Sequence, residues 1–145
     1  HRGIPRVQIP HGHARKRFKS IHLILFMVKA EVLIVENRKP HAMLLEINLN
    51  KAEISTEIAE NLADAYTKIR NGNYKVVICD TKVNDELGYE LKRRLLGEDD
   101  VTPFIALSAS AENQHYWENL GVKFFLKEEI AAEPKKLVEL VRGYL

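Results

Sequence analysis

The sequence predicts an α/β fold, a doubly wound parallel sheet of five strands with five helices on its two faces. Five short apolar runs alternate along the chain with segments whose apolar residues recur at helical spacing. Most of these runs are continuous rather than alternating, which is typical of strands that are buried on both faces. Strands and helices in this order form parallel βαβ units, and right-handed crossovers place the helices on both sides of the sheet.

The expected strands are short and rich in β-branched or aromatic residues, which favour extended structure. The second of them is the most polar, as is common for a strand at the edge of a sheet. The five runs are residues 32–35, 53–58, 76–79, 104–107 and 122–126.

Each expected helix carries apolar residues three or four positions apart. The clearest stripe, in the second helix, ends before Gly72, a residue that suits a helix C-terminus. We expect Pro134 to begin the last helix, and Trp117 or Tyr116 to lie in the core. The fourth expected helix spans 112–120 and ends before Gly121, and the apolar positions of the others are Met43, Leu44, Ile47 and Leu49; Leu62, Ala65, Tyr66 and Ile69; Leu87, Leu91, Leu95 and Leu96; and Leu137, Val138, Val141 and Tyr144.

Charge divides the chain into an N-terminal arm and a body. Residues 1–26 contain six of the 22 Lys and Arg and no acidic residue, so residues 27–145 hold 16 basic and 20 acidic residues. We interpret residues 1–26 as a segment added for expression or as the end of an upstream linker, and residues 27–145 as one domain. Alternatively, the basic cluster at 15–19 contacts phosphates or anionic lipid.

The body has the composition of a cytoplasmic protein that binds neither nucleic acid nor membrane. Its acidic balance argues against a nucleic-acid-binding face. The apolar run at 21–28 is far shorter than the roughly 20 residues of a membrane span. Cys79 is the single cysteine, so no internal disulfide forms. Neither His41 nor His115 has a Cys or second His at ligand spacing, so we expect no zinc site.

Polar residues close four of the predicted strands. In an open parallel sheet the carboxyl ends of the strands form the binding site, so these side chains are expected to meet at one edge. Each alone has an ordinary explanation, as a turn cap, a helix cap or a solvated cation, but the combination favours a functional site. The residues are Glu36 and Asn37, Asp80, Ser108, and Lys127.

Such a cluster suits phosphoryl chemistry. Two neighbouring carboxylates, Glu36 and Asp80, repel unless a cation lies between them, and Mg²⁺ needs only a few protein oxygens because it keeps several waters. A carboxylate neutralised in this way can attack a phosphoryl donor and form an acyl phosphate. The ammonium of Lys127 and the hydroxyl of Ser108 could then bind the added phosphoryl oxygens.

These segments resemble the receiver domains of two-component response regulators. The similarity covers about residues 31–145 and rests on several motifs in order, none decisive alone. The motifs are VLIVEN at 32–37, VVICD at 76–80, TKVNDELG at 81–88, ALSA at 106–109 and FFLK at 124–127.

The resemblance implies a sheet in the order 2-1-3-4-5 and a switch rather than a classical enzyme. Asp80 would accept a phosphoryl group, with Mg²⁺, from a sensor histidine kinase or a phosphotransfer protein. Lys127 would pair with that group, Ser108 would hydrogen-bond to it, and Phe124 would turn inward. The metal ligands implied are Glu36, Asn37, Asp80 and the backbone carbonyl of Lys82.

The same resemblance places the partner surface on helix 4, strand 5 and helix 5. An output domain, a target protein or a second copy of the chain in a homodimer would bind there.

Some residues depart from the family pattern. Asn37 replaces the usual second acid, which should weaken Mg²⁺ binding, while Asn84 and Glu128 stand where proline is common. The stretch 121–127 is one residue short, so the assignment of Phe124 as the switch aromatic is an interpretation.

Two other readings therefore stay open. One is a pseudo-receiver, an interaction module independent of phosphorylation. The other, a flavin- or nucleotide-binding protein, lacks a Gly-rich loop after the first strand.

Overall fold

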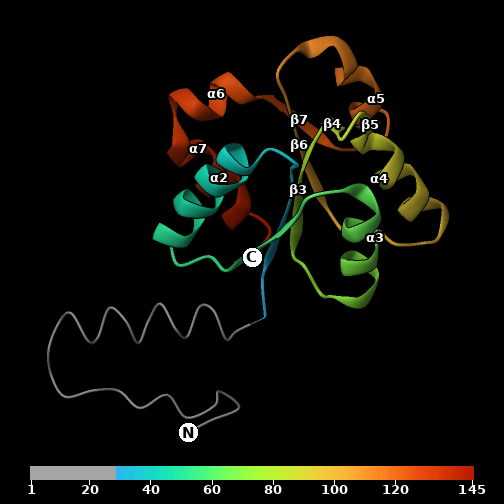
Figure 1. Cartoon of the computed structure of the whole chain (residues 1–145), viewed down its shortest axis with the longest axis horizontal. Helices are drawn as coiled ribbons and strands as arrows, with labels where there is room; N and C mark the ends of the chain where they lie inside the picture. The colour runs from blue at the N-terminus through green and yellow to red at the C-terminus, as the bar shows by residue number, and fades with distance from the viewer. Residues whose placement is uncertain (1–28) are drawn as a thin grey trace, which may run out of the picture.

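The computed structural model describes residues 29–145, and its centre is a five-stranded parallel sheet (Figure 1). The strand order β2-β1-β3-β6-β7 is the predicted order, and all four strand pairs are parallel. The strands are β1 (Val32–Val35), β2 (Thr56–Ala59), β3 (Val76–Asp80), β6 (Phe104–Ser108) and β7 (Lys123–Leu126). The expected N-terminal arm, residues 1–26, lies outside the described residues.

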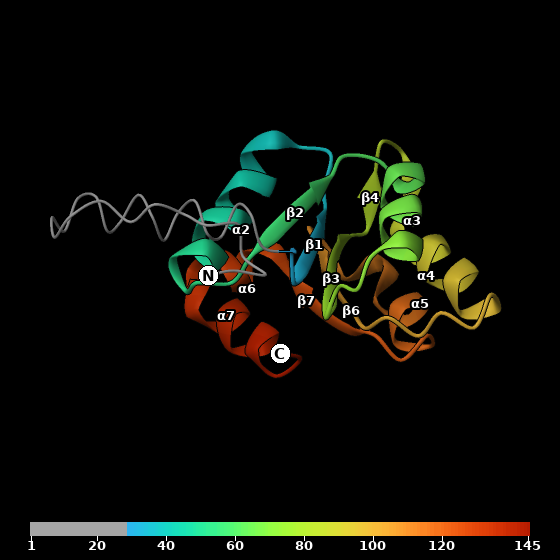
Figure 2. The same ribbon diagram turned by 90° about the horizontal axis from the view of Figure 1, so that it is seen from below.

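Helices cover both faces of the sheet, as predicted. One face packs against α2, α6 and α7 and the other against α3, α4 and α5 (Figure 2). The described residues form helices α2 (Lys39–Lys51), α3 (Leu62–Asn71), α4 (Gly88–Gly97), α5 (Gln114–Glu118), α6 (Lys127–Ala132) and α7 (Pro134–Arg142). None of these helices combines the length and apolar character needed to cross a bilayer.

The two faces bury alternate residues of the same strands. Leu33, Val77 and Cys79 point into the layer under α3, α4 and α5, while Ile34 and Ile78 point towards α2, α6 and α7. Because side chains alternate along a strand, continuous apolar runs are required to fill both layers. This explains why the first, third and fourth strands could be recognised from unbroken apolar sequence.

The helix predictions need two corrections. A sixth helix, α6, begins at Lys127 directly after β7, and the Glu129 side chain caps it by accepting the Leu126 backbone N–H at 3.0 Å. The helix expected over 112–120 is instead a 3₁₀ turn at Ala111–Asn113 followed by the five residues of α5. A helix can be capped at its start by the side chain of its third residue, as Glu129 caps α6. This pattern was missed because residues 122–126 before it have the apolar sequence of a strand.

Two strand predictions also change. The second strand begins at Thr56 rather than residue 53, because Glu53 takes a left-handed conformation (φ 62°) in the turn that ends α2. A small hairpin, β4 (Lys82–Val83) and β5 (Glu86–Leu87), was not expected. Asn84 and Asp85 form its turn with φ of 52° and 63°, values that asparagine and aspartate tolerate better than most residues.

The buried faces of the helices are partly as expected. Trp117 is fully buried and Tyr116 is 39% exposed, so one of these two aromatics is a core residue, as predicted. On α2, however, the buried residues are Ala42 and Leu49, and three larger apolar side chains are about half exposed. These are Met43, Leu44 and Ile47.

Candidate functional site

The register of the sheet brings the predicted strand-end residues to one edge. Val35 is paired with Cys79, so Glu36 and Asp80 follow at the same level on neighbouring strands. Ser108 is paired with Leu126, so Lys127 begins α6 immediately beyond the edge. The site is therefore assembled from residues far apart in the sequence by the parallel pairing alone.

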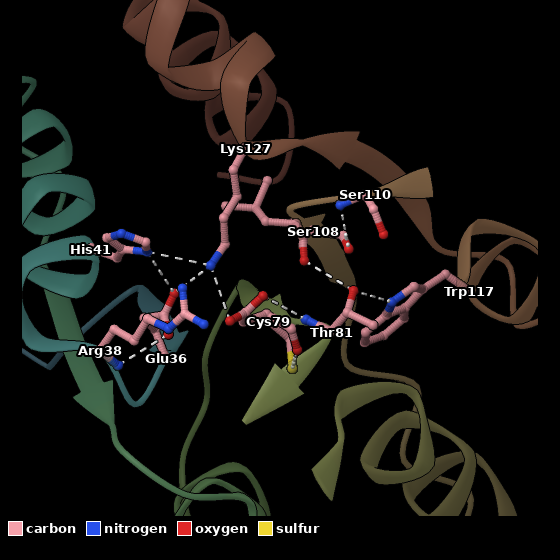
Figure 3. A network of polar contacts seen from close by, with 11 residues as sticks. Glu36, Arg38, His41, Cys79, Thr81, Ser108, Ser110, Trp117 and Lys127 are labelled. Carbon is pink, nitrogen blue, oxygen red and sulfur yellow. Dashed lines mark hydrogen bonds and ion pairs between the residues drawn. The ribbon is translucent and has the colours of Figure 1, made fainter. Parts of the chain in front are cut away.

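Lys127 lies between the carboxylates of Glu36 and Asp80, and Figure 3 shows its side chain reaching towards Glu36. Its Nζ donates to Glu36 Oε1 at 2.8 Å and lies 3.0 Å from Asp80 Oδ2. The side chains of Glu36 and Asp80 are only 2% and 10% exposed, whereas that of Lys127 is 22% exposed. Two nearly buried negative charges thus share one ammonium group, and the three side chains together retain an excess of negative charge.

The electrostatic environment of Asp80 favours its protonated form. Burial and the nearby Glu36 carboxylate raise the pKa of Asp80, while the Lys127 ammonium and the Thr81 backbone N–H oppose the shift. The positive side chain therefore only partly compensates the desolvation and repulsion. A cation or a positively charged hydrogen-bond donor that approached Asp80 would relieve the repulsion between Asp80 and Glu36.

A small hollow of about 140 Å³ opens beside Asp80 and Lys127. Ser108 lies on its wall, and its Oγ accepts the backbone N–H of Ser110 at 3.3 Å. Lys82, whose carbonyl was predicted as a metal ligand, also lines the hollow, and so does Arg38. Its lining therefore combines two carboxylates, three hydroxyls and three cationic side chains, with Glu112, Thr81 and Ser110 beside the residues already named.

Three predicted site residues do not line the hollow, and one of them, Glu36, instead contacts Lys127 from the neighbouring cavity. Phe124, in the middle of β7, is partly buried and packs against the hydrophobic core under α3, α4 and α5. Asn37 follows Glu36, is partly exposed, and does not line the hollow. The structure thus brings Glu36, Asp80 and Lys127 into contact and leaves Phe124 and Asn37 at their margins.

Residues that the sequence analysis did not select also surround the site. His41 Nδ1 lies 3.7 Å from Glu36 Oε1 and 3.5 Å from Lys127 Nζ. Thr81, directly after Asp80, is buried and hydrogen-bonded through its side chain to Trp117. The contacts of His41 and Thr81 depend on how the helices pack on the sheet, so they cannot be predicted from a local sequence pattern.

Gly88 packs against the carboxyl end of β3. A Cβ at this position would lie 2.3 Å from the Asp80 carbonyl oxygen and 2.8 Å from Cys79 Sγ. Such distances are well inside van der Waals contact, so only glycine lets α4 begin this close to the Asp80 backbone. The predicted spacing between Asp80 and this glycine therefore has a steric basis.

The donors at this edge fit Mg²⁺ in kind. Glu36 and Asp80 offer carboxylate oxygens, Lys82 a backbone carbonyl and Asn37 a neutral amide oxygen, all of the hard type that Mg²⁺ prefers. The described residues contain no group of three His, Cys, Asp or Glu side chains that could hold a metal. Since Mg²⁺ is commonly held by one or two carboxylates and waters, two suffice.

The strand order and the arrangement of helices define a flavodoxin-like α/β protein of the receiver type. A family model described as the response regulator receiver domain matches residues 32–141. The chain therefore belongs to this family of two-component signalling modules.

Known proteins agree with this assignment. The uncharacterized transcriptional regulatory protein YkoG of Bacillus subtilis is 32% identical over 83 residues, which are 57% of this chain and 36% of that protein. The chain thus matches only about a third of that relative's length.

Solved structures share the fold at lower identity. The receiver domain of the Francisella response regulator 1452 has a TM-score of 0.69 at 24% identity, covering 80% of this chain and 96% of that one. TrrA of Thermotoga maritima, solved with Mg²⁺ and BeF, has a TM-score of 0.71 at 23% identity, covering 81% and 100%.

Proposed function

We propose that this domain is a phosphorylation switch in which Asp80 accepts a phosphoryl group from a phosphohistidine of a sensor kinase or phosphotransfer protein. The observation that carries the proposal is the placement of Lys127 Nζ 3.0 Å from Asp80 Oδ2, beside a hollow that Ser108 also lines. A carboxylate, an ammonium and a hydroxyl around one small space match the needs of a phosphoryl group.

In the proposed reaction, a carboxylate oxygen of Asp80 attacks phosphorus and forms a new P–O bond. The P–N bond to the donor imidazole breaks, and the imidazole leaves with the electron pair of that bond. Lys127 keeps its charge and moves from the carboxylate towards the phosphoryl oxygens, while Ser108 donates its hydroxyl to them. The product is a mixed anhydride that water later hydrolyses.

Mg²⁺ would supply positive charge against which the phosphoryl oxygens align, held by Glu36, Asp80 and the Lys82 carbonyl. Asn37 supplies a neutral oxygen where related domains have a carboxylate, so we expect the affinity for Mg²⁺ to be low. Arg38 lines the hollow and adds a positive charge directly after Asn37, the residue that replaces the carboxylate. Both residues therefore make the site less negative and less attractive to a divalent cation.

We infer two partner surfaces, one from its counterpart in the family and one from exposed apolar residues. We place the switch-dependent surface for an output domain, a target or a second copy on α5, β7 and α7, the counterparts of the helix 4–strand 5–helix 5 surface. The phosphodonor would approach beside α2, whose Met43, Leu44 and Ile47 are about half exposed. Leu44 also lines a cavity of about 270 Å³ with Glu36 and Lys127, so this apolar face lies next to the reacting groups.

Mass spectrometry of the intact protein tests the proposal. After treatment with acetyl phosphate and Mg²⁺, we expect a gain of one phosphoryl mass that Asp80→Asn abolishes. Asp85→Asn, which removes an exposed carboxylate five residues away, is the matched control and should retain the gain. No gain at millimolar donor and Mg²⁺ would instead support the pseudo-receiver, which Asn37 favours.

A further inference from the structure

Thr81 joins three parts of the molecule through its backbone and side chain. Its backbone N–H is shared between Asp80 Oδ1 at 2.8 Å and the Leu107 carbonyl at 3.0 Å. Its hydroxyl donates to the same carbonyl at 3.1 Å and accepts the indole N–H of Trp117 at 3.0 Å (Figure 3). One residue thus connects the Asp80 carboxylate, the end of β6 and helix α5.

Trp117 is held tightly by its neighbours. It is fully buried, and its ring lies edge-on to Tyr89 with the centroids 6.0 Å apart and 6.3 Å from the ring of Phe104. A Cβ on Gly88 would come within 3.1 Å of the indole. In a core packed at this density a displaced side chain moves its neighbours, because little free space remains to absorb the motion.

The aromatic contacts continue from Trp117 to the surface. Tyr116 stacks on Tyr89 with the centroids 4.8 Å apart, and Tyr116 is 39% exposed. The ring of His115 also contacts Tyr116, with the centroids 4.0 Å apart. Because α5 has only five residues, a shift of Trp117 moves the whole helix rather than bending part of it.

We propose that the Thr81–Trp117 hydrogen bond makes α5 respond to phosphorylation of Asp80, by a route separate from Ser108 and Phe124. The inference rests on the proposed function. A phosphoryl group on Asp80 replaces the carboxylate that accepts the Thr81 N–H and brings more negative charge to it. The backbone N–H of Thr81 then reorients between Asp80 and Leu107. The Thr81 hydroxyl moves with the backbone, and the Trp117 indole that is hydrogen-bonded to it shifts as well. Thr81 lines the hollow and its backbone N–H contacts Asp80, but the role proposed for its hydroxyl and for Trp117 is one of positioning.

Trp117 is the single tryptophan, so ¹⁵N-labelled protein gives one indole N–H signal that reports on this bond. We expect acetyl phosphate with Mg²⁺ to shift this signal beyond the effect of Mg²⁺ alone, in step with the mass gain. Thr81→Ser keeps the hydroxyl, so its indole signal should shift as in the wild-type protein. Thr81→Val should still be phosphorylated on Asp80, but its indole signal should lose at least half of the shift. Thr67→Val, on the exposed side of α3, is the matched control.

The outcomes separate the relay from the phosphorylation itself. A mass gain with an unmoved indole signal, or an equal shift in Thr81→Val, overturns the relay and leaves the proposed function intact. An absent mass gain in the wild-type protein overturns both. If Thr81→Val does not fold, Phe124→Leu decides, because Phe124 does not line the hollow: the relay requires that the indole signal of this variant still shifts on phosphorylation, and a lost shift contradicts a separate route.

Discussion

The two halves of the site differ in how far they are assembled. In the Glu36–Asp80–Lys127 half, the ammonium already contacts both carboxylates at 2.8 and 3.0 Å. In the Ser108–Phe124 half, the hydroxyl accepts only a backbone N–H of its own loop, and the aromatic ring packs against the core. The first half is thus already assembled in the way that the proposed chemistry requires. In the second, the Ser108 hydroxyl keeps one long hydrogen bond that a phosphoryl group can replace at little cost.

The comparison predicts the largest effect for Lys127→Met. The two carboxylates would lose their shared ammonium, and a positioned charge of this kind contributes on the order of 100-fold to a rate. We expect the rate of phosphoryl gain, followed by mass spectrometry, to fall by that factor. Lys123→Met removes an exposed lysine of β7 and should leave the rate unchanged. An equal loss in both variants would show that Lys127 acts only through overall charge.

The next largest effect is expected for Asn37→Asp. A third carboxylate at this edge adds an attraction of roughly 1–4 kcal/mol for a charge about 4 Å away, depending on the effective dielectric constant. We therefore expect Mg²⁺ to bind about tenfold tighter or more, measured by calorimetric titration. Asn73→Asp, an exposed position before β3, is the control. Unchanged affinity would mean that residue 37 does not face the cation.

The raised pKa of Asp80 predicts a pH-dependent stability. An acid whose pKa is raised by folding binds its proton more tightly in the folded state, so its ionisation destabilises the fold. Compared with Asp80→Asn, the wild-type protein should lose stability as the pH rises from 3.8, the ordinary value, through the raised pKa. For each pH unit between these two pKa values, the free energy of unfolding falls by about 1.4 kcal/mol.

Urea unfolding of both proteins from pH 3 to 8 measures this difference. The difference in unfolding free energy between the wild-type protein and Asp80→Asn should be smallest at pH 3 and constant above the raised pKa of Asp80. A difference that is the same at every pH would show that the burial of Asp80 has no electrostatic cost.

The smallest effect on stability is expected for Ser108→Ala. The hydroxyl accepts one hydrogen bond at 3.3 Å, so we expect the free energy of unfolding to change by less than about 1 kcal/mol. The phosphorylated variant should, however, lose the conformational response of Phe124, measured by the NMR signals of its ring. A large loss of stability would contradict the view that this half of the site is loosely held.

Much of the fold could be predicted because the signals are local. Unbroken apolar runs marked the buried strands, and parallel pairing then required Glu36, Asp80 and Lys127 to meet. The start of α6 at Lys127 was missed because the strand pattern and the helix cap overlap at β7. The Thr81–Trp117 bond joins residues 36 positions apart and depends on how α5 docks, so no sequence pattern marks it.

The placement of Lys127 at the start of α6 has a pharmacological consequence. This lysine also lines the cavity of about 270 Å³ between α2 and α6, whose walls include Leu45 and Ile130. Cavities with mostly apolar walls and few polar groups are the usual sites of small-molecule inhibitors. A compound lodged there would lie against Lys127 on the side of α2 from which we propose that the phosphodonor approaches, and would slow the proposed reaction by competing with the donor.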